Sequence, residues 1–126
     1  MDELAAGKLI EKKSRFYAHL YLLNTKQDIN NILQIHQNRY TKANHHCYAL
    51  CFSSQKHGSS EEFSDDGEVG RPGRILLQVL QHHQLHHHAL VVSRVFGGIK
   101  LGVGGVSRAF RKSGEGVVNL YQSSKA

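Results

Sequence analysis

The sequence predicts an α+β two-layer sandwich, in which helices cover one face of a mostly antiparallel sheet. Three observations support this fold class. Short runs with strand-like alternation are interspersed with longer stretches of helical periodicity. The chain has 126 residues, which is enough for one domain with one core. Its 40% hydrophobic and 21% charged residues are typical of a globular protein rather than a disordered one.

The first half of the chain contains the clearest strand pattern and one amphipathic helix. Residues 15–22 alternate between apolar and polar side chains, so we expect a half-buried strand, with residues 9–12 as its hairpin partner. Thr25 and Asp28 match a helix-start signal, a hydroxyl followed by a carboxylate about one turn later. The expected helix then shows one face at helical spacing: Ile29, Ile32, Leu33, His36 and Tyr40.

The second half alternates strands and helices again. Residues 46–53 and 89–96 are rich in strand formers, and residues 55–73 are expected to form a long polar loop. Each of these strands is followed by an expected helix. The first begins near Pro72, which suits a first turn, and its helical face is Ile75, Leu76, Val79, Leu80 and His83. The second has the face Val106, Ala109, Phe110, Ser113, Val117 and Leu120, and it is expected to break at Gly114 and Gly116, because glycine weakens a helix.

The formal net charge of +6 is unevenly distributed along the chain. Residues 61–68 hold five of the ten acidic residues and no base, so the rest of the chain carries 16 bases against five acids. A strongly basic body favours partners that carry phosphate or acidic groups. The charge therefore indicates RNA or an acidic protein surface as a partner, and it says nothing about the fold.

The N-terminal residues and the cysteines indicate a cytoplasmic protein. Residues 1–8 begin with acidic side chains and lack an apolar stretch, so they do not form a signal peptide. The apolar runs elsewhere fall far short of the ~20 residues that cross a bilayer. Cys47 and Cys51 lie about 13 Å apart if their segment is a strand, which is too far for a disulfide. We therefore expect free thiols, with neither a membrane nor a disulfide partner.

The most informative stretch joins the last expected strand to the last helix, where residues 97–105 hold five glycines. Glycine lets backbone N–H groups approach a ligand, and a helix N-terminus favours anions. The stretch matches neither nucleotide-binding glycine signature, so a tight connection between strand and helix is the alternative. The candidate nucleic-acid-binding or anion-binding residues are Arg94, Gly97, Gly98, Lys100, Gly102, Gly104, Gly105, Arg108, Arg111 and Lys112.

An acidic turn, Asp65-Asp66-Gly67-Glu68, precedes the helix that is expected near Pro72. Clustered carboxylates could hold a hard cation such as Mg²⁺, or supply acid and base groups. The alternatives are structural, because the acids could cap that helix or pair with the basic body. We favour a structural role and assign no metal site.

Histidines and strand side chains give further candidates. The cluster at residues 82–88 could bind a metal, or it could form a solvated connection. A nucleophile pair is conceivable among His45, His46, Cys47 and Cys51, but no third group orients them, and packing is favoured. The polar face of the first long strand could stack bases unless another element covers it; it consists of Arg15, Tyr17, His19 and Tyr21.

Three regions of the sequence together resemble one protein family. Residues 13–18 read K-S-R-F-Y-A, and residues 43–49 read A-N-H-H-C-Y-A. Residues 65–68 read D-D-G-E, and residues 94–110 read R-V-F-G-G-I-K-L-G-V-G-G-V-S-R-A-F. These motifs resemble the signature of the IMPACT family, whose bacterial branch is known as YigZ. Outside the glycine stretch, the family-motif residues are His45, Cys47, Asp65, Asp66, Gly67 and Glu68.

The resemblance implies a fold similar to the second domain of ribosomal protein S5, a layer of strands with helices on one face. It also implies a role in translation. Eukaryotic members bind the ribosome-associated activator of the kinase that phosphorylates an initiation factor in amino-acid starvation, and bacterial members are suggested to bind nucleic acid. No catalytic residue and no cofactor follow from the resemblance. The RWD and ferredoxin-like domains of relatives do not fit in 126 residues, so we expect one IMPACT-type domain over residues 1–126.

The leading hypothesis is a non-enzymatic, cytoplasmic, translation-associated regulatory module of the stress response. It would bind RNA, the ribosome or the kinase activator through the basic glycine-rich surface. The alternative is an enzyme that acts on a phosphorylated small molecule, in which the glycines cradle the phosphate and residues 65–68 hold a metal. A pure protein-interaction domain is the third hypothesis.

Overall fold

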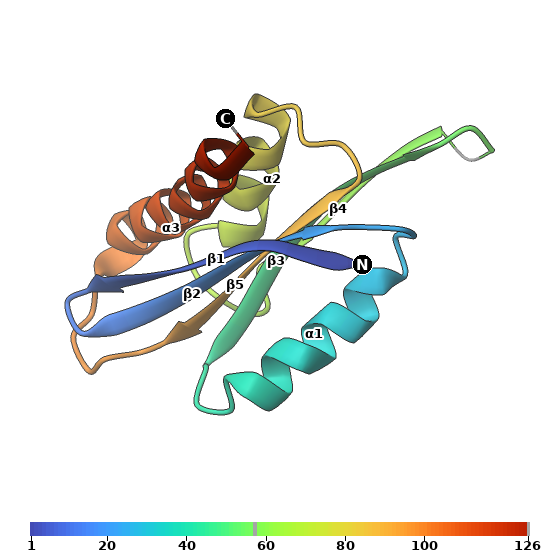
Figure 1. Ribbon diagram of the computed structural model, residues 1–126. Helices are drawn as coiled ribbons and strands as arrows, with labels where there is room; N and C mark the ends of the chain where they lie inside the picture. Colours follow the sequence, from blue (N-terminus) through green and yellow to red (C-terminus); the bar gives the residue numbers. More distant parts are fainter. Residues whose placement is uncertain (57, 126) are drawn as a thin grey trace.

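The computed structural model describes residues 1–56 and 58–125. Its centre is a five-stranded sheet in the order β1-β2-β5-β3-β4, in which each neighbouring pair is antiparallel (Figure 1). The strands are β1 (Asp2–Glu11), β2 (Ser14–Leu22), β3 (His45–Ser54), β4 (Gly58–Ser64) and β5 (His88–Val95), and the helices are α1 (Asp28–Arg39), α2 (Pro72–His82) and α3 (Gly102–Lys125). Within the described residues, no helix combines the length and apolarity needed to cross a bilayer.

The observed strands match the predicted ones and add one. β1 pairs with β2 along nearly its whole length, which confirms the expected hairpin, and β3 and β5 cover the other stretches predicted as strands. β4, in contrast, lies inside the stretch predicted as a polar loop, residues 55–73. It is an edge strand whose one large apolar residue, Phe63, is itself 46% exposed. Because β4 buries little apolar surface, its sequence lacks the alternating apolar residues by which a strand is predicted.

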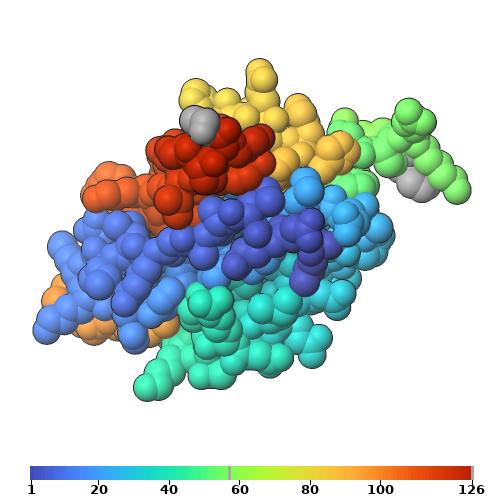
Figure 2. Space-filling model, viewed as in Figure 1, coloured from blue at the N-terminus to red at the C-terminus, as the bar shows by residue number. Residues whose placement is uncertain are grey.

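Both faces of the sheet are covered by helices (Figures 1 and 2). α2 and α3 pack on the face that contains Leu90, whereas Ile29 and Ile32 of α1 pack on the opposite face, against Val91. The α+β class and the antiparallel sheet are confirmed, but the expectation of helices on one face holds for α2 and α3 and is wrong for α1. The reason lies in the central strand β5, because residues 89–92 are all buried and each of its faces needs a cover.

α3 is one uninterrupted helix, so the expected break at Gly114 and Gly116 is wrong. A Cβ on Gly114 would lie 3.1 Å from Leu76 Cδ2 and 3.2 Å from Leu90 Cδ2. The glycine therefore lets α3 approach α2 and β5 closely. This packing offsets the roughly 1 kcal/mol by which a glycine weakens a helix relative to alanine.

Candidate functional site

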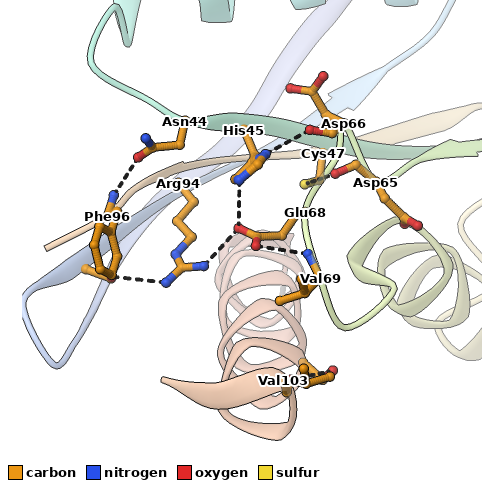
Figure 3. Close-up of polar contacts among 12 residues, drawn as sticks. Asn44, His45, Cys47, Asp65, Asp66, Glu68, Val69, Arg94, Phe96 and Val103 are labelled. Atoms are coloured by element: carbon orange, nitrogen blue, oxygen red, sulfur yellow. Dashed lines mark hydrogen bonds and ion pairs between the residues drawn. The ribbon is translucent and has the colours of Figure 1, made fainter. Parts of the chain in front are cut away.

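Motif segments that are far apart in the sequence meet at one end of the sheet (Figure 3). The acidic turn of residues 65–68 contacts the start of β3, and the end of β5 leads through residues 96–101 into α3. Together these segments enclose a groove of about 440 Å³. We call it the α3 groove, and its lining residues are Asn44, His45, Val69, Arg94, Phe96, Lys100, Leu101, Gly102, Val103 and Val106.

The acidic turn serves as a structural element. Asp65 Oδ1 accepts a hydrogen bond from the N–H of Gly73 at the start of α2 (2.9 Å), and Asp66 Oδ2 accepts one from the N–H of His46 (2.7 Å). A Cβ on Gly73 would lie 2.9 Å from the same Asp65 oxygen, so glycine lets the carboxylate approach the helix end. A carboxylate also suits the positive end of the helix dipole. Asp65 therefore caps α2, which is one of the structural roles considered for this turn.

Glu68 and Arg94 form a buried ion pair at the α3 groove. Arg94 Nη1 donates to Glu68 Oε2 over 2.9 Å, and the two side chains are 7% and 4% exposed. Glu68 Oε2 also lies 3.6 Å from His45 Nε2, and Glu68 Oε1 accepts the N–H of Val69 (3.0 Å). Arg94 Nη2 reaches Ser14 Oγ (3.4 Å) in the β1–β2 hairpin. Arg94, predicted as an anion-binding residue, thus has its charge balanced inside the protein.

The cysteines are buried and free. Burial, followed by the nearby charge of Glu68, raises the pKa of the Cys47 thiol well above its ordinary value. Burial raises the pKa of Cys51 to about 11. The Cys47 thiol donates to the backbone oxygen of Asp65 (3.2 Å), which ties β3 to the acidic turn. A thiol that stays protonated is a poor nucleophile, so the packing role favoured from the sequence agrees with the geometry.

The predicted basic residues point in different directions. Lys100 lines the α3 groove, whereas Arg108 and Lys112 line a second hollow of about 320 Å³. Arg111 donates to Gln78 Oε1 on α2 over 2.8 Å. Arg94 and Lys100 share the α3 groove, Arg108 and Lys112 share the second hollow, and Arg111 contacts α2. The structure therefore does not gather the five bases on one surface.

The predicted glycines also serve different purposes. A Cβ on Gly97 would lie 2.1 Å from the backbone of Lys13, so this glycine allows the β5–α3 connection to pack against the β1–β2 turn. Gly98 has a φ of 90°, in the region that favours glycine. The remaining glycines belong to α3 and not to the loop predicted from the sequence: Gly102, Gly104 and Gly105.

Apolar side chains are exposed around the α3 groove, a feature that sequence reasoning missed. Val69 is 50% exposed, Phe96 44%, Ile99 42% and Val103 61%. Large apolar side chains gathered on a surface are typical of a protein interaction site. These apolar residues lie beside glycines, at or beyond the ends of the expected strands and helices. That position is the feature of the sequence from which their exposure could have been predicted.

A polar network is buried between α1 and the sheet. His36 Nε2 bonds to Tyr21 Oη (2.9 Å) and His36 Nδ1 to Ser93 Oγ (2.7 Å), and Ser93 Oγ also contacts His46 Nδ1 (2.7 Å). Burial, followed by the neighbouring histidines and Arg39, lowers the pKa of His36 to about 3. Burial between α1 and the sheet therefore keeps His36 in its neutral form at neutral pH.

α1 also covers the strand face that could have stacked bases. His19 and Tyr21 are buried there, and His19 bonds to Glu3 and to Tyr40 Oη. Tyr17 stacks on Tyr40, with ring centroids 4.4 Å apart. Of the two possibilities raised by this alternating face, the structure shows the covered one.

The histidine-rich segment makes separate local contacts. His83 Nε2 lies 2.6 Å from Glu115 Oε2, and His88 Nδ1 bonds to the backbone oxygen of His86. In the part of the chain that the structure describes, no group of three or more histidine, cysteine or acidic side chains could hold a metal ion.

The fold and the meeting of these motifs define a small domain of the Impact type. The Impact N-terminal domain matches residues 12–118 of the chain. The chain therefore belongs to the Impact family, as its motifs predict.

Curated relatives from bacteria and eukaryotes extend this result. The IMPACT family member YvyE of Bacillus subtilis is 37% identical over 114 residues, which is 90% of this chain and 52% of YvyE. YigZ of Escherichia coli is 32% identical over 100 residues, covering 79% of this chain and 49% of YigZ. A protein IMPACT homolog of Dictyostelium discoideum is 33% identical over 94 residues, covering 73% of this chain and 27% of the homolog. The chain spans about half the length of the bacterial relatives.

Two solved structures have the same fold. The crystal structure of a hypothetical protein aligns with a TM-score of 0.82 and 27% identity, covering 91% of this chain and 56% of that one. The two-domain translational regulator Yih1 aligns with a TM-score of 0.63 and 20% identity, covering 94% of this chain and 46% of Yih1. The similarity to Yih1 concerns the fold alone.

Proposed function

We propose that this chain is a translation-associated regulatory module that binds a protein partner through the α3 groove. Membership of the Impact family supports this role, because Yih1, which has the same fold, is a translational regulator. The ribosome-associated activator of the starvation kinase, which the resemblance implies for eukaryotic members, is one protein of the proposed class. The proposal places the chain in the cytoplasm, where such a partner acts.

The exposed apolar side chains around the α3 groove carry the proposal. Val69, Phe96 and Val103 are each at least 44% exposed. Covering them would contribute about 25 cal/mol for each Å² of apolar surface removed from water. Glu68 and Arg94 balance each other beside them, so a partner can cover the groove without burying an unpaired charge there. RNA, in contrast, is bound mainly through accessible cations that contact phosphates.

RNA is a second candidate partner, and one observation favours it. Lys12, Arg108 and Lys112 line the hollow between the β1–β2 turn and α3. Lys112 contacts Glu11 at 3.4 Å, but the two side chains are 67% and 39% exposed, so their pairing is weak. This hollow shares Leu101 with the α3 groove and otherwise has its own lining. Mutations can therefore separate the two candidates.

The enzymatic alternative has less support from the geometry. It requires the acids of residues 65–68 to face a common substrate or metal. Asp65 and Asp66 instead accept backbone N–H groups, and Glu68 pairs with Arg94. We therefore propose binding rather than catalysis.

A nuclease-controlled pull-down from a lysate of the source cells tests the proposal. Ribosomal proteins and translation factors captured by the immobilised chain are quantified with and without nuclease treatment. We expect Val103→Glu to lower their capture and the matched control Ile10→Glu to leave it unchanged. The two positions are equally exposed, at 61% and 60%, but Ile10 lies on β1, outside the groove.

Two results would contradict a protein partner at the groove. Capture that persists unchanged in Val103→Glu would remove the groove from the binding surface. RNA would instead be the partner if nuclease treatment abolished capture and the double variant Arg108→Ala/Lys112→Ala abolished it as well. Steep weakening with added salt would accompany this second result.

A further inference from the structure

The charges that line the α3 groove have one sign. Arg94 and Lys100 are cations, and none of the described lining residues is an acid. Glu68 balances Arg94, whereas no described residue forms an ion pair with Lys100. Asp65 and Asp66 lie outside the lining of the groove, where each accepts a backbone N–H group. Among the described residues, the groove therefore presents one positive charge without an ion-pair partner, that of Lys100, beside apolar side chains.

The walls of the groove are tied to one another in the absence of a partner. Ser107 Oγ on α3 donates to the backbone oxygen of Gly70 (2.8 Å), and a Cβ on Gly70 would lie 2.5 Å from that hydroxyl. On the other side, the N–H of Phe96 donates to Asn44 Oδ1 (2.9 Å). These bonds hold both the turn after β4 and the end of β5 in place. A groove with fixed walls loses little conformational entropy on binding.

Building on the proposed function, we propose that the α3 groove binds a short segment of a protein partner that carries a large apolar side chain next to an acidic one. The apolar side chain would pack between Phe96 and Val103, and the carboxylate would pair with Lys100. A volume of about 440 Å³ lies within the range of sites that hold a compact ligand. Charge complementarity selects this partner, because a basic segment would meet Lys100 with the same sign of charge.

Selection from a phage-displayed library of random short peptides tests this proposal. The full chain is the bait, and a Val103→Asn variant, whose new side chain is polar but uncharged, removes peptides that bind elsewhere. We expect the selected peptides to share a leucine-like residue beside aspartate or glutamate. Their affinity, measured by fluorescence anisotropy, is expected to fall about tenfold in Val103→Asn and about fivefold in Lys100→Glu.

Charge reversal on both sides makes the test specific. A selected peptide whose acidic residue is replaced by lysine should bind Lys100→Glu more tightly than it binds the wild-type chain. The control Lys125→Glu, at the other end of α3, should change neither peptide's affinity. Peptides enriched in basic residues, or equal affinities in Lys100→Glu and wild type, would overturn the proposed partner chemistry.

The outcomes also separate this inference from the function on which it rests. Loss of lysate capture in Val103→Glu without an acidic preference among the peptides would refute the partner chemistry and keep the groove as a binding surface. Unchanged capture in that variant would refute both.

Discussion

Acid should destabilise this protein through His36, and the size of the effect follows from its surroundings. The side chain is 1% exposed and both ring nitrogens are hydrogen-bonded, to Tyr21 and Ser93. Burial lowers the pKa of His36 from 6.5 to about 3 in the folded chain, whereas the unfolded chain keeps the ordinary value. The stability contributed by neutral His36 is therefore complete above pH 6.5 and is lost as the pH falls toward 3.

The magnitude comes from the linkage between protonation and folding. One pKa unit corresponds to about 1.4 kcal/mol, so His36 is expected to lower the free energy of unfolding by about 2 kcal/mol between pH 7 and pH 5. His19 and His46, whose pKa values burial also lowers, add to the total loss. A comparison with a His36→Gln variant isolates the share of His36, because glutamine does not titrate.

Urea unfolding at pH 7, 6 and 5 provides the assay. The wild-type chain should lose about 2 kcal/mol more stability over this range than His36→Gln, and His82→Gln, an exposed histidine on α2, should behave like the wild type. Equal pH dependence in the wild type and His36→Gln would refute the reasoning. Should His36→Gln fail to fold, histidine NMR of the wild-type chain answers the same question, since the His36 imidazole should not titrate between pH 5 and 8.

Three further predictions concern packing and buried charge. Glu68→Gln leaves the Arg94 guanidinium buried without a counter-charge, so it should lower the free energy of unfolding by about 3 to 5 kcal/mol, measured with urea. The control Glu62→Gln, which removes an exposed pair with Lys26, should lower it by less than about 1 kcal/mol. Similar losses in the two variants would contradict the buried pair. Gly114→Ala should lower the melting temperature, because the added Cβ crowds Leu76 and Leu90. Gly116→Ala should raise the melting temperature, because the space around Gly116 is open and alanine favours the helix. The opposite order would show that helix propensity outweighs packing at Gly114. The Cys47 and Cys51 thiols should resist alkylation at pH 8 until the chain is unfolded, which mass spectrometry can follow, and rapid labelling of the folded chain would contradict their burial.

The sequence predicted the elements that bury a regular pattern. Residues 89–96 and the α2 face from Ile75 to Leu80 were identifiable because burial demands apolar residues at the spacing of a strand or a helix. β4 escaped prediction because it lies at the edge of the sheet and buries little. The uninterrupted α3 escaped because the reason for Gly114 is its contact with Leu76, which is remote in sequence.

The candidate site was predictable as a set of segments but not as an arrangement. The motifs identified His45, Glu68 and Arg94, yet nothing local in the sequence indicates that Glu68 balances Arg94, 26 positions further along. The expected basic surface assumed that nearby bases share a face. α3 instead directs Arg111 toward α2 and Arg108 toward the β1–β2 turn, because a helix distributes successive residues around its axis.

The position of β5 has a consequence for how the chain acquires its structure. β5 is the last strand to be synthesised, yet it lies between β2 and β3 and joins the two hairpins β1–β2 and β3–β4. A nascent chain that ends before His88 therefore holds two hairpins with no shared strand, and isolated hairpins are at best marginally stable. Pairing of β5 with β2 also closes a long loop, which is slow relative to local contacts. The domain is thus expected to fold late in its own synthesis, after residues 88–95 have left the ribosome and while the apolar inner faces of both hairpins are still exposed to water.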